Sequence, residues 1–272
     1  MLDVIKNHPS KIIKNSTAKG FLAECNDGNL WFVRCKKIDK NSKRLFSTYL
    51  SHILGLEFKL SVPEVSIVKL DKTFIERLNK NSIVFDIDCC MGVATKFIPN
   101  LVKMRKPKSK SNYEYLKSKL SFINLKQIYG IKIFAHWIFL SDYYKSENIQ
   151  ISKNNNIYFL DFDMAFLSNY GDWGPLPEYE YRRCVNNPAP FMEGFSGDIV
   201  PMEEWFDNMQ KINYISVIEK TLTIPKCWEV PEGYLYETLS HLFFYRSIFI
   251  KEFKRAIEYN INRNNYNIIN PF

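Results

Sequence analysis

Short runs of mainly hydrophobic residues, separated by polar turns, occur through the first hundred residues, which is the pattern of β-strands. Phe21–Cys25 and Leu30–Lys36 are two such runs, and the turn Asn26–Asn29 joins them. The Asp-Gly pair inside this turn is a strong signal for a β-hairpin. Val65–Leu70 and Val93–Ile98 are predicted as two further strands. The first part of the chain is therefore expected to consist mainly of strands.

One helix interrupts this strand-rich part. From Lys40 to Leu54 the apolar residues fall at helical spacing and share one face. Gly55 follows at the position where glycine often terminates a helix, because glycine adopts the left-handed conformation without strain. The pattern therefore predicts that this helix ends at Gly55.

The second half of the chain has the longer period of helices. Leu125–Leu140 is helical by period and length, and its last part, Ile131–Leu140, is the most apolar stretch of the sequence. That stretch contains Lys132 and His136 and covers about half of the roughly 20 apolar residues that cross a membrane. It is therefore predicted to be a buried core helix. Tyr234–Tyr259 is predicted as one long amphipathic helix.

A basic, polar stretch separates the two halves. Lys103–Lys110 holds most of its residues as Lys, Arg, Ser or Pro and is interpreted as a connector. A length of 272 residues suits either two lobes around one cleft or one large domain. We expect an α+β protein with a strand-rich N-terminal lobe over residues 1–98 and a helical C-terminal lobe over residues 99–272. The hinge is expected near Phe97–Asn100.

Composition excludes several classes of protein. Hydrophobic residues make up 46% and charged residues 24%, which excludes a disordered tail, a collagen-like chain and a coiled coil. Lys and Arg exceed Asp and Glu by 37 to 29, so the net charge is +8. This charge and the Lys103–Lys110 cluster leave a nucleic-acid-binding module as one hypothesis, although such a run is more often a solvated loop.

The cysteines and the N-terminus indicate a cytoplasmic protein. The six cysteines show no CxxC spacing and are predicted to be free thiols. No apolar run follows the first lysines, so neither a signal peptide nor a membrane segment is expected.

The segment from His136 to Phe166 carries the candidate chemistry. An apolar helix leads to Asp142, Asn148 precedes a short strand, and a hairpin then leads to Asp161. Phosphoryl transfer requires one carboxylate that orients and deprotonates the acceptor hydroxyl. It also requires an Asn and a second carboxylate that hold Mg²⁺, a hard cation that prefers oxygen ligands. The ordered set of Asp, Asn and Asp therefore indicates a phosphotransferase site.

Two alternatives remain open at this segment. Asp163 lies two residues after Asp161 and shares its face in an extended chain, so it competes for the role of metal ligand. The same residues also fit a purely structural interpretation, in which Asp142 caps a loop, Asn148 begins a strand and the later aspartates lie in a turn.

These stretches resemble the HipA-like protein kinases, in particular the short form without the extra N-terminal domain. The resemblance covers most of the chain. The matching places are the strand pair Asp27–Arg34, the helix and exit at Leu50–Leu56 and Val62–Glu64, the set Asp142, Asn148 and Asp161, and the stretches Ile224–Trp228 and Leu242–Arg246.

The resemblance implies a two-lobed, protein-kinase-like fold and ATP- and Mg²⁺-dependent phosphorylation of a Ser or Thr hydroxyl, expected on a protein substrate. It assigns Asp142 as the catalytic base and Asn148 and Asp161 as metal ligands. Arg34 or Lys36, which share one strand face, would contact the phosphates.

Two departures from the family pattern leave a second hypothesis. Arg34 stands where the family has its ATP-contacting lysine, and Lys43–Ser47 lacks the glutamate that fixes such a lysine. Glu24 on the preceding strand is a possible substitute. The alternative is a nucleotide-binding pseudokinase that acts as a scaffold or regulatory partner, and it gains support if neither Lys36 nor Glu24 faces the cleft.

Overall fold

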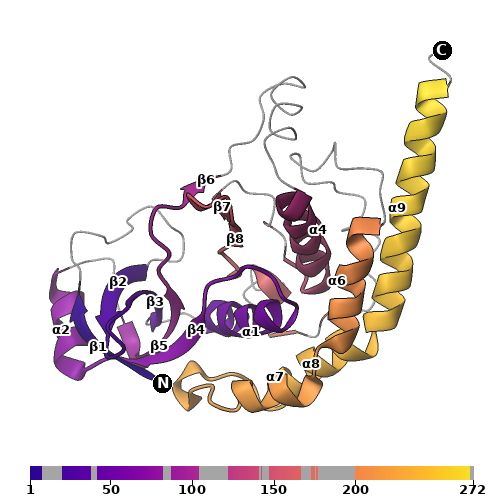
Figure 1. Cartoon of the computed structure of the whole chain (residues 1–272). Coiled ribbons are helices and arrows are strands. Elements are labelled where there is room, and N and C mark those ends of the chain that lie inside the picture. The colour runs from indigo at the N-terminus through magenta and orange to yellow at the C-terminus, as the bar shows by residue number, and fades with distance from the viewer. Residues whose placement is uncertain are drawn as a thin grey trace.

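A computed structural model of the chain places a small barrel of strands at one end and a group of helices at the other (Figure 1). The structure describes residues 1–7, 20–37, 42–81, 87–103, 122–140, 142, 147–166, 173–174, 176 and 200–269. In this part of the chain no helix has both the length and the apolar character needed to span a membrane.

The barrel is closed by five strands in the order β1-β2-β3-β5-β4. The strands are β1 (Leu2–Asn7), β2 (Gly20–Cys25), β3 (Leu30–Lys37), β4 (Val65–Lys69) and β5 (Ile87–Lys96). All neighbours are antiparallel except β1 and β4, which pair in parallel and close the barrel. The predicted strands at the positions of β2 to β5 are confirmed, whereas β1 was not anticipated.

The hairpin between β2 and β3 forms as the sequence predicts. Gly28 has φ +75°, a conformation that suits glycine at a tight turn. The backbone N–H of Cys25 donates to the carbonyl of Asn29 (3.0 Å) and closes the turn. The indole of Trp31 donates to the carboxylate of Asp27 (Nε1 to Oδ2, 3.1 Å).

Alternation along the hairpin separates the barrel core from the site. Phe21, Ala23 and Val33 belong to the buried cluster inside the barrel. Because neighbouring side chains in a strand point to opposite faces, Leu22 and Arg34 point outwards. Both line the cavity described below.

The first helix, α1 (Lys43–Glu57), runs past its predicted end. Gly55 lies inside the helix, and its place is explained by packing: an added Cβ would lie 3.2 Å from a methyl carbon of Val62. The left-handed conformation is taken by Lys59 instead (φ +69°). A second helix, α2 (Lys72–Asn81), was not anticipated and packs Phe74 and Leu78 against the barrel.

A small second sheet has the order β6-β7-β8. It consists of β6 (Val102–Lys103), β7 (Ile149–Ile151) and β8 (Ile157–Phe159). β7 and β8 form the predicted hairpin, in which Ile149 pairs with Phe159.

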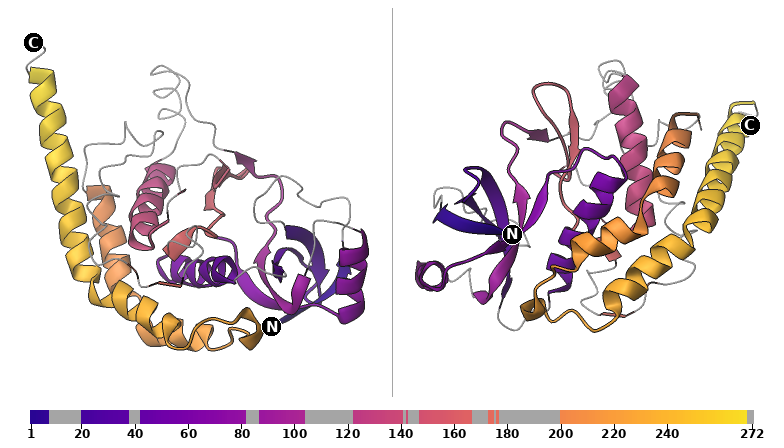
Figure 2. Two further views of the ribbon diagram at one scale, coloured as in Figure 1. Left: turned by 180° about the vertical axis from the view of Figure 1, so that it is seen from behind. Right: turned by 60° about the horizontal axis from the view of Figure 1, so that its bottom comes forward.

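Most of the remaining described chain is helical. The elements are α4 (Phe122–Trp137), α6 (Val200–Lys211), α7 (Tyr214–Thr221), the 3₁₀ turn η3 (Lys226–Trp228), α8 (Tyr234–Phe244) and α9 (Arg246–Ile269). The prediction of one helix over Tyr234–Tyr259 is wrong, because the chain turns at Tyr245 and α8 and α9 run in different directions (Figures 1 and 2). The indole of Trp137 bonds to the carbonyl of Leu242 in the last turn of α8 (3.2 Å), a contact that competes with continuation of the helix.

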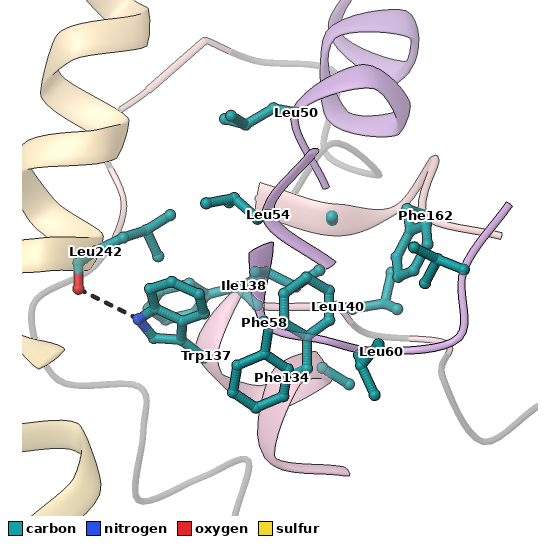
Figure 3. Close-up of a cluster of buried hydrophobic side chains, with 14 of the residues drawn as sticks. Leu50, Leu54, Phe58, Leu60, Phe134, Trp137, Ile138, Leu140, Phe162 and Leu242 are labelled. Atoms are coloured by element: carbon teal, nitrogen blue, oxygen red, sulfur yellow. Dashed lines mark hydrogen bonds between the residues drawn. The ribbon is translucent and has the colours of Figure 1, made fainter. Parts of the chain in front are cut away.

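The main core lies between α1 and the helices beyond it (Figure 3). The ring of Phe58 stacks against Phe134 and Trp205, at centroid distances of 5.3 and 5.2 Å. The predicted core helix is confirmed, since the apolar residues of Ile131–Leu140 are buried. α1 therefore contributes to the larger core and lies between the barrel and the other helices (Figure 2).

A second connection joins the barrel to the C-terminal part of the chain. Cys89 of β5 forms a disulfide with Cys227 of η3, and the indole of Trp228 donates to the carbonyl of Met91 (3.0 Å). The prediction of free thiols is therefore wrong for this pair, whereas Cys25, Cys35 and Cys90 are free. The two bridged cysteines are 138 residues apart, a separation that no local spacing rule detects. Cys184 lies outside the described residues.

We predict that this disulfide stabilises the fold. A crosslink that closes so long a loop lowers the conformational entropy of the unfolded chain. It is expected to raise the free energy of unfolding by up to about 5 kcal/mol. Cys227→Ser should therefore lower the melting temperature by several degrees. Dithiothreitol should lower the melting temperature of the unchanged protein by the same amount. Cys90→Ser is the matched control, because Cys90 is an exposed free thiol beside Cys89. Equal melting temperatures with and without reductant would contradict the prediction.

Candidate active site

A cavity of about 730 Å³ lies between the barrel and the small sheet. Its walls come from β2, β3 and β5, from the segment after β5, and from the residues around β7 and β8. The lining residues are Leu22, Phe32, Arg34, Pro63, Thr95, Lys96, Phe97, Ile98, Asn100, Leu101, Lys103, Asp142, Glu147, Asn148, Gln150, Leu160, Asp161, Asp163 and Met164.

One part of the lining is apolar and the other is polar. Leu22 and Phe32 of the barrel contribute apolar surface, as do Leu160 and Met164 after β8. The predicted hinge, Phe97–Asn100, forms part of the wall. A cavity that combines apolar surface with convergent polar groups is typical of a small-molecule site.

An ion pair joins the two sides of the cavity at its polar part. Nη2 of Arg34 on β3 lies 3.0 Å from Oδ1 of Asp161, which follows β8. The Arg34 side chain is 12% exposed and the Asp161 side chain 31%. The two residues are 127 positions apart in the sequence, so this pair connects the barrel to the hairpin segment.

Two further contacts surround the Arg34 guanidinium. Nη1 donates to Oγ1 of Thr48 on α1 (3.3 Å), and Cζ lies 5.4 Å from the ring centroid of Phe32. The guanidinium is therefore held by a carboxylate, a hydroxyl and an aromatic ring.

The Arg34 contact sets the charge of Asp161. Burial alone would raise the pKa of this carboxyl, but the Arg34 guanidinium and the backbone N–H of Asp163 lower its pKa below the usual value. Both contacts are made by Oδ1, with the N–H of Asp163 at 3.4 Å. Asp161 is therefore a carboxylate at neutral pH, and Oδ2 has no hydrogen-bond partner among the described residues.

Asp163 behaves in the opposite way. It is only 4% exposed, and burial together with the negative charge of Asp161 raises its pKa to about 6, although Arg34 and Arg44 act against the shift. Nη1 of Arg44 lies 3.6 Å from Oδ2 of Asp163. The pKa values of the two neighbouring carboxyls are therefore shifted in opposite directions, because Arg34 bonds directly to only one of them.

Asp142 and Asn148 lie together at the same part of the cavity. Nδ2 of Asn148 donates to the carbonyl of Asp142 (3.1 Å), and both side chains are buried. The backbone N–H of Leu160 donates to the carbonyl of Asn148 (3.0 Å). Because this bond ties the start of β7 to the end of β8, Asn148 lies beside the segment that carries Asp161.

The structure brings together Arg34, Asp142, Asn148 and Asp161, and it places Lys36 elsewhere. Nζ of Lys36 lies 2.7 Å from Oε2 of Glu229, just after η3. Lys36 shares the strand face of Arg34, but it is two residues, roughly 7 Å, further along β3. Neither Lys36 nor Glu24 is among the lining residues.

The donor atoms at this place suit a hard divalent cation. Asp161 supplies a carboxylate oxygen, and the amide oxygen of Asn148 is the atom not used in its bond to Asp142. Oxygen donors of this kind are what Mg²⁺ prefers. Among the described residues, no three His, Cys, Asp or Glu side chains form a metal cluster by themselves. Further oxygen ligands of such a cation would have to come from groups other than these side chains, such as water.

Sequence reasoning missed two residues of this site. Thr48 and Arg44 both lie on α1 and contact Arg34 and Asp163 respectively. Neither residue belongs to a motif, and their spacing of four residues on one helix face was the only available signal.

The sequence profile of the HipA-like kinase family matches residues 9–234, which is more than half of the chain. The chain belongs to this family. The resemblance stated from the sequence motifs is thereby confirmed.

One solved structure, that of CtkA, confirms the predicted protein-kinase-like fold. The proinflammatory kinase CtkA of Helicobacter pylori matches with a TM-score of 0.57 at 12% identity, covering 93% of this chain and 96% of CtkA. The Golgi casein kinase matches with a TM-score of 0.39 at 13% identity, covering 92% and 74%. Its form with Mn/ADP bound gives 0.37 at 13% identity, covering 89% and 72%. A search of the curated proteins found no match.

We predict that Asp163→Asn stabilises the metal-free protein above pH 6. The folded state binds the Asp163 proton more tightly than the unfolded state, so stability falls as pH rises from about 4 to about 6. Removing the charge should recover on the order of 2–3 kcal/mol at pH 7. Thermal melting with EDTA at pH 5 and pH 7.5 measures this difference. Asp161→Asn is the control and should destabilise the protein, because it removes the counter-charge of buried Arg34.

Proposed function

We propose that this HipA-like kinase transfers the γ-phosphoryl group of ATP, in the presence of Mg²⁺, to a Ser or Thr hydroxyl of a protein. The observation that carries the proposal is the convergence of Arg34, Asp142, Asn148 and Asp161 on one cavity. These residues come from β3, from the loop after α4 and from both ends of the β7–β8 hairpin.

The two parts of the cavity suit the two parts of a nucleotide. Leu22, Phe32 and Met164 offer apolar surface for a flat base. Arg34 offers a cation for the phosphates, and a guanidinium binds phosphate oxygens in a bidentate manner. Lys36 has no part in this proposal, because it contacts Glu229 away from the cavity.

Asn148 and Asp161 are the residues that would hold Mg²⁺. When bound, the metal neutralises charge on the phosphate oxygens. The fit rests on the lowered pKa of Asp161 and on the amide of Asn148, which is fixed by its bond to the Asp142 carbonyl.

Asp142 is the proposed base. Its carboxylate would accept the proton of the acceptor hydroxyl as that oxygen bonds to the γ-phosphorus and the bond from phosphorus to the ADP oxygen breaks. ADP leaves with the electron pair of the broken bond. Asp142 is buried at the cavity wall, beside Asn148.

The pseudokinase remains a second candidate. It is favoured by one observation, namely that neither Lys36 nor Glu24 lines the cavity. In that case the cavity would bind nucleotide without phosphoryl transfer, and the protein would act as a scaffold or regulatory partner.

Three further expectations from the sequence stay predictions. They are the division into lobes near residue 98, the cytoplasmic location and the protein acceptor. The nucleic-acid hypothesis rests on Lys103–Lys110, of which only Lys103 lies within the described residues, and that side chain lines the cavity.

Mg²⁺-ATP is expected to stabilise the protein, and Asp161→Ala should abolish most of this effect. A ligand at 100 times its dissociation constant adds about 2.7 kcal/mol to stability, which a melting curve resolves. Asp163→Ala is the matched comparison and should retain more of the shift, because Asp163 lacks the direct Arg34 contact that keeps Asp161 ionised. If both variants lose the same part of the increase in melting temperature, the assignment of Asp161 as the metal ligand is wrong. If Mg²⁺-ATP does not raise the melting temperature of the unchanged protein, the kinase proposal is wrong.

Asp142→Asn is expected to leave ATP binding nearly intact and to remove phosphoryl transfer. A general base contributes roughly 10²–10⁴-fold to turnover, so the loss should appear in kcat. Transfer of labelled phosphate to the protein itself or to a mixture of candidate proteins is the measurement. If the unchanged protein binds ATP but labels no acceptor, the pseudokinase candidate replaces the enzyme.

A further inference from the structure

The helix beside Arg34 offers it a hydroxyl in place of a carboxylate. Thr48 of α1 accepts a hydrogen bond from Nη1 of Arg34 (3.3 Å) and is 1% exposed. Thr48 does not line the cavity. Any effect it has on a ligand must therefore be exerted through Arg34.

One face of α1 is fixed to the segment that carries the two aspartates. Oγ of Ser47 donates to the carbonyl of Ala165 (3.0 Å), and the ring of Phe46 packs against Phe166 (6.3 Å between centroids). Arg44 contacts Asp163 on the same side. The position of Thr48 relative to Asp161 is therefore set by several contacts and not by Arg34 alone.

A buried histidine holds the backbone of Thr48. Nδ1 of His52, one turn further along α1, lies 2.7 Å from the carbonyl of Thr48, and its ring meets Phe162 edge-on (4.7 Å). Burial lowers the pKa of His52 to about 4, so the ring is neutral at pH 7 and Nδ1 donates. The backbone that carries the Thr48 hydroxyl is thus held in place by His52.

Arg34 needs this second contact because its ion pair has a single point of attachment. Only Nη2 bonds to Asp161, through one oxygen, and Nε has no hydrogen-bond partner among the described residues. One hydrogen bond, with the Phe32 ring 5.4 Å from Cζ, defines the plane of the guanidinium less well than two hydrogen bonds do. A second contact on Nη1 defines the plane, and the plane decides which phosphate oxygens the group can reach.

We propose that Thr48 is a positioning residue that orients the Arg34 guanidinium for the phosphates of the nucleotide, taking the place of the helix glutamate that the motif comparison did not find. This inference rests on the proposed function, because it assumes that phosphates bind at Arg34. It adds a residue outside the cavity to the phosphate-binding site.

The test compares phosphate-dependent with phosphate-independent binding. Thr48→Val keeps the shape and removes the hydroxyl, Thr48→Ser restores it, and Ser51→Ala is the matched control. Ser51 is also a buried hydroxyl of α1, but its Oγ has no hydrogen-bond partner among the described residues. Calorimetry with Mg²⁺-ATP and with adenosine gives the affinities. Thr48→Val should weaken ATP binding about 10-fold, the usual scale of one hydrogen bond to a charged group, and leave adenosine unchanged.

A double-mutant cycle shows whether Thr48 acts through Arg34. In an Arg34→Met background, Thr48→Val should cause no further loss of ATP affinity, since the group it positions is already absent. Three outcomes would each overturn the inference while leaving nucleotide binding in place. They are an unchanged ATP affinity in Thr48→Val, an equal loss of adenosine and ATP affinity in that variant, and a loss of ATP affinity from Thr48→Val that is as large in the Arg34→Met background. Failure of the unchanged protein to bind ATP would instead overturn the proposed function itself.

Discussion

The ion pair between Arg34 and Asp161 is the constraint on which the site depends. A buried charge that loses its partner costs several kcal/mol, so each residue fixes where the other must lie. Arg34 belongs to the barrel, and Asp161 follows the hairpin of the small sheet. The pair therefore holds the barrel and the hairpin in a fixed relative position on the two sides of the cavity.

Contacts away from the ion pair keep the same geometry. α1 joins the larger core through residues such as Phe46, and it contacts Arg34 through Thr48 and Asp163 through Arg44. η3 attaches to the barrel through the Cys89–Cys227 disulfide and the Trp228 indole. The barrel is thus tied to the rest of the chain through α1, through η3 and through the segment after β5. A cavity whose walls are tied at several points is suited to hold its polar groups in fixed positions.

Features encoded by neighbouring residues were predictable from the sequence, and features that depend on distant residues were not. The hairpins at Asn26–Asn29 and around β7 and β8 follow from short apolar runs and turn residues, and their prediction was confirmed. The convergence of Asp142, Asn148 and Asp161 was found because all three lie within one short segment. Gly55 was misread because its small size serves packing against Val62, a contact that no helix-end rule contains. Thr48 carries no motif, and its role depends on where Arg34 reaches in space.

The charges at the polar part of the cavity explain why neighbouring carboxyls differ. Asp142, Asp161 and Asp163 all act on Arg34, which is their shared buried cation. Arg34 bonds directly to Asp161 alone, and the pKa of Asp163 rises because its own burial and the charge of Asp161 are only partly offset by Arg34 and Arg44. A site with more carboxyls than cations either retains a proton or takes up a further cation. A divalent metal between Asn148 and Asp161 would supply that charge, so the same imbalance that raises the pKa of Asp163 in the protein alone favours Mg²⁺ in the proposed complex.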